Sequence, residues 1–469
     1  MWQRVVRTAL ILGVVVALVG VAFWKPISVT WTLHEARGLL RQRESERAVA
    51  LLSTAHQRDP QHPEVNYLLA RGFRRLGQFN KVVEHLDLAE GFGWPGELIR
   101  LEQLMGAAQA GQLTASAPEL YKFLSRGGDY GDEGPEVCEA LVNGYFLSYQ
   151  FGLAQPLLDE WQAAYPEDSQ CYMFRGLFFE NRSNPGKAVG EYRKAVELSG
   201  ERTDVRLRLA QVLKKTNQYD EAIAQFEICR SEDPGHPEVL TGLGQCYHGQ
   251  GQIEPARQMF QKVLATEADF FDAQLALGQL EETAGRPAEA LRWLRPACRR
   301  RPSDTEARYS LALSLQKVGR QQRDAIPWPP SEALTLGQAL SWAGQRAEAS
   351  LTLSEASHHF QFVADAQQAM GRVQVWTDII RSEPRNADLR YKIGNHLMKY
   401  DNPEHGLGWL LSVLDIDPEH VPTHRLLADY YERAGKSERA KLHRDRVGKR
   451  RGDTASGNHS ESGQPNNTQ

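Results

Sequence analysis

The sequence has few of the residues that build metal centres and disulfide frameworks. Only 5 of its 469 residues are cysteine. They are widely spaced and form no C-x-x-C pair, so neither a zinc site nor a disulfide framework is indicated. A large excess of charge of one sign is also absent, because the net charge is −4. That balance is too mild to indicate a nucleic-acid partner, which requires a concentrated basic face. We expect no cofactor, no nucleic-acid partner and no small-molecule ligand.

Catalytic sequence patterns are missing as well. There is no H-E-x-x-H, G-x-S-x-G, phosphate-binding loop or dinucleotide fingerprint, and no convincing strand, so we expect a protein that is not an enzyme. One enzyme hypothesis stays open. It requires a pocket in residues 321–384 that unites His358 or His359 with Asp365 and Asp378. Neighbouring residues of a helix point about 100° apart, so the two histidines are poorly placed to share a metal.

An uncharged apolar run follows Arg4 and Arg7 near the N-terminus. It is slightly shorter than the roughly 20 residues that cross a bilayer. We expect residues 9–25 to form a single transmembrane anchor, with residues 1–8 in the cytoplasm and the rest of the chain outside it, in a periplasm or its equivalent. A cleaved signal peptide is the alternative, because Gly20-Val21-Ala22 offers small residues of the kind that a peptidase site needs.

The remaining chain is organised by one period of 34 residues. A small residue in an apolar helical context is followed twelve residues later by alanine. Around each pair, apolar residues fall at i, i+3, i+4 and i+7, which predicts amphipathic helices. The pairs in phase are Gly176 and Ala188, Ala210 and Ala222, Gly244 and Ala256, and Gly278 and Ala290. We expect the small residue of the first helix to face the alanine of the second, so that the two backbones approach closely.

Glycine recurs seven residues after the small position, and proline recurs between units. Glycine lets the first helix end in a left-handed residue, and proline stops the second helix. Each unit is therefore two antiparallel helices of roughly a dozen residues. The glycines are Gly77, Gly111, Gly251, Gly285, Gly319, Gly344 and Gly435.

Six residues of one unit fill the offsets that recur along the chain. They are Leu243, Gly244, Tyr247, Gly251, Ala256 and Phe260. In their classes, spacing and period they resemble the tetratricopeptide repeat family, over about residues 32–447. The resemblance implies an all-α protein, an α-solenoid of helical hairpins that forms a right-handed superhelix, with the first helix of each unit lining the concave face.

The phase of the repeat divides the chain into segments. We expect about nine units over 32–320, the third degenerate and the ninth without its second helix. A proline-rich break at 321–330 follows, then a second array with a basic capping helix over 331–447. That array should begin with a clean hairpin over 337–353. The Gly, Ser, Asn, Thr and Gln composition of 448–469 predicts a disordered tail.

One row of amide side chains is the leading candidate for binding. The position after the small residue should face the concave side, and it is Gln211, Gln245 and Gln279 in three consecutive units, with Asn143 and Asn395 at matching places. Amides can donate to and accept from an extended peptide backbone. The alternative is that exposed helical positions simply favour glutamine.

Four further residues are candidates for the same groove. Arg71 and Arg75 would meet acidic partners or form a solvated face. Trp328, flanked by prolines, would anchor a partner or fill the space left by the missing helix. Tyr391 lies on the face that the resemblance makes concave.

The leading hypothesis is a membrane-anchored scaffold that binds partner proteins or peptides in its groove and is not an enzyme. The alternative is an accessory factor of an envelope polymer or glycan synthesis or export machine, which binds carbohydrate or its enzymes. That alternative predicts stacked aromatic side chains on the concave face, where Tyr67, Tyr309 and Tyr391 are scattered.

Overall fold

A computed structural model describes residues 29–125, 133–148, 150–200, 202–326, 336–383 and 385–456. The regular structure of these residues is helical and includes no strand, which confirms the all-α prediction. The chain divides into two compact units. The N-terminal unit is Met1–Leu147 with Pro156–Trp161, and the C-terminal unit is Ser148–Gln155 with Gln162–Gln469.

The helices follow one another with short turns. The N-terminal unit holds a helix over residues 29–41, then α2 (Ser45–Arg58), α3 (Pro63–Arg75), α4 (Phe79–Gly91), α5 (Gly96–Gln109), α6 (Leu113–Ser125) and α7 (Glu133–Leu147). Residues of α8 (Phe151–Ala164) belong to both units. The C-terminal unit holds α9 (Ser169–Asn181), α10 (Pro185–Ser199), α11 (Thr203–Lys215), α12 (Tyr219–Glu232), α13 (Pro237–Gly249), α14 (Ile253–Thr266), α15 (Phe271–Thr283), α16 (Pro287–Arg300), α17 (Thr305–Ala325), α18 (Leu336–Ser382), α19 (Ala387–Tyr400), α20 (Pro403–Leu414), α21 (Val421–Arg433) and α22 (Ser437–Ser456).

Left-handed residues end the first helix of most hairpins, as predicted. Five of the seven named glycines have positive φ, and they are Gly77, Gly111, Gly251, Gly285 and Gly435. Where the repeat lacks glycine at this place, Ser183 and Asn217 adopt φ of 53° and 59°. Short polar side chains tolerate this conformation better than most. The turn geometry is therefore set by the repeat itself rather than by glycine alone.

The small residues of the first helices do allow close packing, both with the small residue twelve positions on and with a large side chain of the second helix. The carbonyl oxygen of Gly406, twelve residues after Gly394, would lie 3.0 Å from a Cβ at Gly394. A Cβ at Gly244 would lie 2.4 Å from the ring of Phe260, and a Cβ at Gly176 would lie 2.6 Å from the ring of Tyr192. In both hairpins the neighbour lies sixteen residues on, one turn beyond the expected alanine. The glycine therefore makes room for a large side chain of the second helix, which fills the core between the two.

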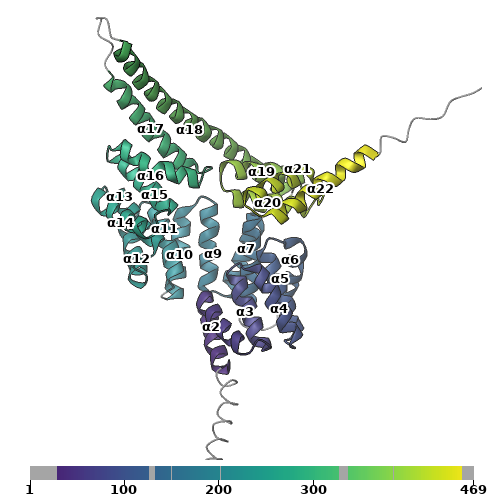
Figure 1. Cartoon of the computed structure of the whole chain (residues 1–469). Coiled ribbons are helices and arrows are strands. Elements are labelled where there is room, and N and C mark those ends of the chain that lie inside the picture. The colour runs from purple at the N-terminus through teal and green to yellow at the C-terminus, as the bar shows by residue number, and fades with distance from the viewer. Residues whose placement is uncertain are drawn as a thin grey trace, which may run out of the picture. The chain divides into compact units, whose positions relative to one another are not determined.

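The long helix α18 corrects two predictions about the middle of the chain. The ninth hairpin does have a second helix, because α18 runs beside α17 (Figure 1). A Cβ at Gly319 would lie 2.9 Å from Leu353, and Tyr309 meets Phe360 edge to face. The hairpin predicted over 337–353 is wrong, since those residues belong to one continuous helix. Its only interruption signal was Gly344, and one glycine costs a helix only about 1 kcal/mol.

The second half of α18 begins the packing of the last hairpins. Val373 and Ile380 share a buried cluster with Ile393 of α19 and Trp409 of α20. The pair α21 and α22 then follows in contact. Thus α18 packs against two successive parts of the array, α17 at its start and α19 at its end.

Two predicted helix ends lie later in the chain than expected. The break placed at 321–330 begins later, because α17 continues to Ala325, and the first proline of that stretch is Pro327. Proline disfavours helix in the residue before it, so the helix can extend to this point. The tail predicted from 448 is helical as far as Ser456, because adding residues to an existing helix is easier than starting one.

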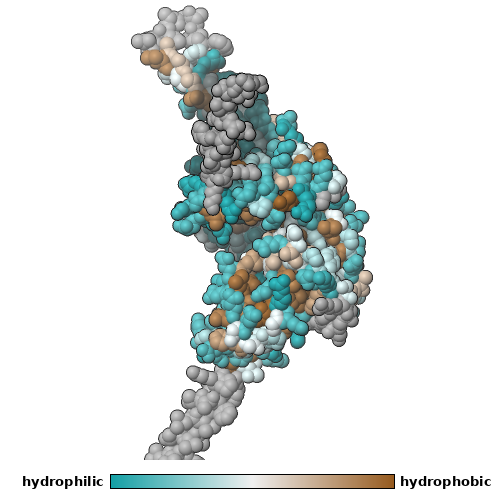
Figure 2. Space-filling view, turned by 90° about the vertical axis from the view of Figure 1, so that its right-hand side faces the viewer, coloured by the Kyte–Doolittle hydropathy of each residue, from teal (hydrophilic) through white to brown (hydrophobic). Residues whose placement is uncertain are grey.

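Two further predictions fall outside the described residues, namely the anchor at 9–25 and Trp328. Among the described residues, no helix is long and apolar enough to cross a membrane. On the face drawn in Figure 2, hydrophilic residues dominate and apolar ones form separate patches. This is the surface expected of helices whose apolar stripes are buried between neighbouring hairpins.

Candidate functional site

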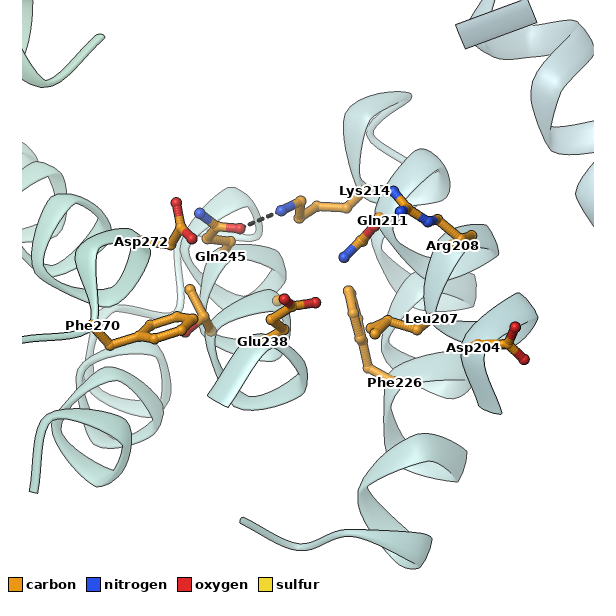
Figure 3. A pocket seen from close by; sticks show the side chains of 12 residues that line it. Asp204, Leu207, Arg208, Gln211, Lys214, Phe226, Glu238, Gln245, Phe270 and Asp272 are labelled. Atoms are coloured by element: carbon orange, nitrogen blue, oxygen red, sulfur yellow. Dashed lines mark hydrogen bonds between the residues drawn. The ribbon is translucent and has the colours of Figure 1, made fainter. Parts of the chain in front are cut away.

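The first helices of three consecutive hairpins enclose a groove in the C-terminal unit. Helices α11 and α13 contact each other, as do α13 and α15, which agrees with the expectation that first helices line one face. Between them lies a cavity of about 440 Å³ (Figure 3). Its lining is Asp204, Leu207, Arg208, Gln211, Lys214, Phe226, Glu238, Thr241, Gly242, Gln245, Phe270 and Asp272.

Apolar side chains form the walls of this groove. Leu207 and Phe226 lie on one side and Phe270 on the other (Figure 3). Phe226 is fully buried. Its ring packs against Gly242 so closely that a Cβ on this glycine would lie 2.3 Å from it, so a larger residue would not fit there. The glycine of α13 therefore opens the space into which the second helix of the preceding hairpin projects its ring. Apolar walls with a few polar groups are typical of ligand pockets.

The predicted amide row is divided by the structure. Gln211 and Gln245 line the groove. Lys214 donates a hydrogen bond to Oε1 of Gln245 (Figure 3). Gln279 does not line the groove. Its Nε2 instead donates a hydrogen bond to Oε1 of Glu306 at 2.9 Å. Two of the three amides are thus brought together where a ligand backbone could reach them.

An acidic row in the same groove was missed by the sequence analysis. Asp204, Glu238, Asp272 and Glu306 are each the second residue of a first helix and lie 34 residues apart. The first three line the cavity. The period that revealed the amides would have revealed these carboxylates too. Acidic residues are common in the first turn of a helix because the helix dipole stabilises a negative charge there. A role of these carboxylates in binding was therefore easy to overlook.

The carboxylates of this row differ in their partners. Asp204 pairs with Arg202 at 2.6 Å. Nη1 of Arg301 lies 3.7 Å from Oδ1 of Asp272, longer than a hydrogen bond. Glu238 makes no hydrogen bond or ion pair within the described part of the chain. Its carboxylate points into the groove, towards Leu207 and Phe226 (Figure 3).

Burial changes the pKa of two charged groups here. Desolvation raises the pKa of Asp272, and the nearby negative charge of Glu238 raises it further, while Arg301 opposes both. Desolvation also lowers the pKa of Lys214. Both shifts mean that the groove holds charges at some cost in free energy, which an opposite charge on a ligand would reduce.

One buried hydroxyl lines the groove without a partner. The side chain of Thr241 is 3% exposed, and its Oγ1 has no hydrogen-bond partner among the described residues. A buried polar atom left unpaired destabilises the free protein by about 1–3 kcal/mol. A ligand that donates to or accepts from this hydroxyl would remove that penalty.

Two predicted arginines belong instead to an internal ion cluster of the N-terminal unit. Arg71 pairs with Glu133, and Arg75 pairs with Glu136, each with little exposed surface. Between them Arg74 is fully buried. The interpretation of these arginines as a solvated face or a docking patch is therefore wrong, because their charges are already matched by carboxylates of α7.

The centre of this cluster is held by short charge-assisted bonds. Nε of Arg74 lies 2.6 Å from Glu102, and its Nη2 lies 2.7 Å from Glu136. Burial alone would raise the pKa of Glu136, but the guanidinium groups of Arg75, Arg43 and Arg74 hold it well below its usual range. The cluster fills the space beside the first helices α3, α5 and α7 with the protein's own side chains.

The remaining predicted residues do not line the groove. Asn143 lies in α7 of the N-terminal unit, and Asn395 lies in α19. The ring of Tyr391 packs at a tilt against His420, with centroids 5.3 Å apart. These three side chains are half-buried. Their positions in the repeat matched the glutamines, but their hairpins do not form the same cavity.

The residues of the enzyme hypothesis are not brought together. Nδ1 of His359 lies 3.2 Å from Nη1 of Arg308, whereas Asp365 accepts a hydrogen bond from Gln361 on its own helix. Asp378 lies almost four turns further along α18. A straight helix cannot converge these groups, so the closed polar pocket that the hypothesis requires is not formed by them.

The comparisons with known proteins agree with the hairpin architecture. Tetratricopeptide repeat models match residues 33–88, 217–280 and 271–314. The chain therefore contains tetratricopeptide repeats, in both units, and repeats of this class serve protein interaction rather than catalysis. The groove lies within the last two matched segments for most of its lining. No curated protein sequence matches this one.

Several solved structures share the repeat at low similarity. YrrB, described as a TPR protein with an unusual peptide-binding site, is 21% identical over 50% of this chain and 95% of its own, with a TM-score of 0.26. The type IV pilus biogenesis factor PilW is 16% identical over 43% and 97%, with a TM-score of 0.36. An IFIT1 mutant with Gppp-AAAA is 13% identical over 83% and 78%, with a TM-score of 0.37. At these scores no functional conclusion follows from them.

Proposed function

We propose that this protein is a membrane-anchored interaction scaffold whose groove between α11, α13 and α15 binds an extended segment of a partner protein. The observation that carries the proposal is the cavity itself, lined by the amides of Gln211 and Gln245 and by the unpaired hydroxyl of Thr241. These groups can donate to and accept from a peptide backbone whatever its side chains are.

The position of the groove supports this proposal. It is formed by consecutive first helices, so its polar groups recur along one direction, as the amides of an extended chain do. In the N-terminal unit the comparable helices are occupied by the cluster around Arg74. The groove of the C-terminal unit is therefore the better candidate for an external ligand.

Anchoring and topology form the second part of the proposal. Residues 9–25 hold the chain in a membrane, residues 1–8 lie in the cytoplasm, and the hairpins follow a right-handed superhelix outside it. The support is the uncharged apolar run after Arg4 and Arg7. Alkaline extraction of membranes tests the anchor, and protease treatment of intact and opened vesicles tests the orientation. Release by alkali, or digestion of the array from the cytoplasmic side, would overturn this part.

Crosslinked affinity purification from native membranes tests the groove. The wild type should capture a defined partner, and Gln211→Ala/Gln245→Ala should lose it while keeping the same melting temperature. Gln279→Ala is the matched control, because it occupies the same place in the repeat but lies outside the cavity. Recovery of the same partner with the double variant would show that binding lies elsewhere.

No observation favours the glycan-binding alternative. It needs aromatic rings that share a face, but Tyr67 is buried and stacks on Trp94 within the N-terminal unit. Tyr309 and Tyr391 lie in α17 and α19 and pack against Phe360 and His420. These rings do not form the platform on which a sugar would stack.

A further inference from the structure

The acidic edge of the groove is incompletely neutralised by the chain. In that row Glu238 has no cation within bonding distance among the described residues, and Asp272 has Arg301 only at 3.7 Å. The guanidinium of Arg301 lies instead over the ring of Phe271, 4.0 Å from its centre. Burial raises the pKa of Asp272, and the nearby negative charge of Glu238 adds to that rise as a smaller cause.

The cations that line the same cavity do not complete this edge. The ammonium of Lys214 donates to Gln245, and burial lowers its pKa. Arg208 is exposed on α11, and Figure 3 shows its side chain on the far side of the groove from Asp272. Both cations come from α11, and although the charge of Lys214 lowers the pKa of Asp272, neither cation pairs with Glu238 within the described part of the chain.

The walls beside the carboxylates fit a long cationic side chain. Leu207 and Phe226 face Glu238 across the cavity, and Phe270 lies on the other side (Figure 3). Lysine and arginine bury their aliphatic stems along such surfaces while the charged head reaches polar groups. The buried hydroxyl of Thr241 has no partner among the residues that the structure describes and lines the same cavity, so a backbone amide or carbonyl beside that side chain could pair with it.

We propose that the groove selects its partner by a lysine or arginine side chain, held by Glu238 and Asp272 between the walls of Leu207, Phe226 and Phe270. The partner is an extended protein segment with a cationic residue. This inference rests on the proposed function, because it names the class of segment that the same groove binds. The neighbouring amides and Thr241 bind its backbone, and the carboxylates supply the selectivity.

Selection from a displayed library of random dodecapeptides tests the inference. The bait is the purified full-length chain, and the baits to compare are the wild type, Glu238→Lys and Glu289→Lys. Glu289 is the matched control, because it is an exposed helix residue of α16 that pairs with Arg292 and lies outside the cavity. All three baits are first checked for equal melting temperature and helical content.

We expect the wild type and Glu289→Lys to enrich peptides with lysine or arginine at one shared position. Glu238→Lys should lose that preference and select acidic residues instead. A peptide chosen by the wild type should bind Glu238→Gln roughly tenfold more weakly, and raising the salt from 50 to 500 mM should weaken its binding to the wild type.

The two possible failures are distinguishable. Enriched peptides that lack a cation, or a cationic preference that survives in Glu238→Lys, would overturn the selectivity and leave peptide binding intact. If no peptide is enriched by the wild type, both the selectivity and the proposed groove function fall.

Discussion

Leu353 of α18 lies over Gly319 of α17, so closely that a Cβ on the glycine would come 2.9 Å from Cγ of the leucine. This contact seats α18 against the ninth hairpin as its second helix. An ion pair reinforces it, since Nη1 of Arg295 in α16 lies 2.7 Å from Glu355. Residues 337–353, which the repeat pattern assigned to a separate hairpin, therefore form part of the second helix of the ninth hairpin.

The continuity of α18 gives the first prediction. Gly344 lies inside this helix, and nothing is within 4 Å of a Cβ built on it. Gly344→Ala should therefore stabilise the helix locally by about 1 kcal/mol, because alanine has the better helix propensity. Hydrogen exchange of the amides around residue 344 should slow in the variant.

Gly251→Ala is the comparison for that change. Gly251 has a φ of 77° and ends the first helix of its hairpin, so alanine there should destabilise by about 1–2 kcal/mol. If Gly344→Ala were destabilising by a similar amount, Gly344 would be a left-handed turn residue. The separate hairpin expected from the sequence would then be correct.

The buried leucines of the repeat give the second prediction. Leu243 is 0% exposed in a cluster formed by α10, α11, α12 and α13, and Leu243→Ala should cost about 2–5 kcal/mol through the cavity that it leaves. Leu351→Ala, at a residue that is 70% exposed, should change stability by less than about 0.5 kcal/mol. Urea unfolding followed by circular dichroism compares them, and equal losses would contradict the assigned packing.

The parts of the fold that sequence predicted well are those that one repeat specifies locally. Turns such as Gly251 and Gly285 need a left-handed residue at a fixed offset, and the spacing alone locates them. At Gly319 and Gly344 the same signal failed. Whether a helix ends there depends on what packs beside it, and α18 offers a partner to α17 that no local pattern reveals.

Only part of the candidate site was predicted from the sequence. Gln211 and Gln245 were found because each sits beside a small residue, while Glu238 was overlooked although it obeys the same period. The fate of Arg71 was not predictable from its neighbours in sequence, since its carboxylate partner Glu133 lies 62 residues away. From sequence alone, consecutive arginines are expected to be exposed to solvent. Only the folded chain brings their carboxylate partners close to them.

The ion cluster of the N-terminal unit gives the third prediction. Arg74→Met should destabilise that unit by about 3–5 kcal/mol, because Glu102 and Glu136 would remain buried without the guanidinium that binds both. Arg193→Met removes an exposed pair with Glu221 and should cost less than about 1 kcal/mol. Thermal melting of the full chain, with hydrogen exchange to localise the loss, makes the comparison. Similar effects of the two changes would mean that the cluster is open to water.

Acid should weaken the same unit through Glu136, which gives the fourth prediction. Its pKa in the folded chain is well below the ordinary value of 4.5, so the folded state releases this proton more readily than the unfolded state. The stabilisation is therefore complete above pH 4.5 and is lost as the pH falls below it. Hydrogen exchange or melting of the N-terminal unit between pH 6 and 3 should show the loss. Glu136→Gln should reduce the slope, and an unchanged slope would exclude Glu136 as its source.

A pair of buried histidines at the C-terminal hairpin should act in a higher pH range. Nδ1 of His443 in α22 lies 2.8 Å from Nδ1 of His424 in α21, and the ring of His443 stacks on Tyr431. Burial, with the charge of His424 as a lesser cause, lowers the pKa of His443 below its ordinary 6.5. The folded hairpin therefore binds this proton less readily than the unfolded chain, and stability should fall as the pH drops through 6.5.

His443→Phe tests this assignment because phenylalanine keeps a ring against Tyr431 and cannot be protonated. The variant should lose less stability than the wild type between pH 7.5 and 5.5, measured by hydrogen exchange of α21 and α22. His405→Asn is the control, since the hydrogen bond that His405 donates to Asp401 raises the pKa of His405 and gives it the opposite effect on stability. A variant His443→Phe with the full acid sensitivity of the wild type would mean that the proton is taken up elsewhere, and that the close approach of the two rings does not make this end of the array sensitive to pH.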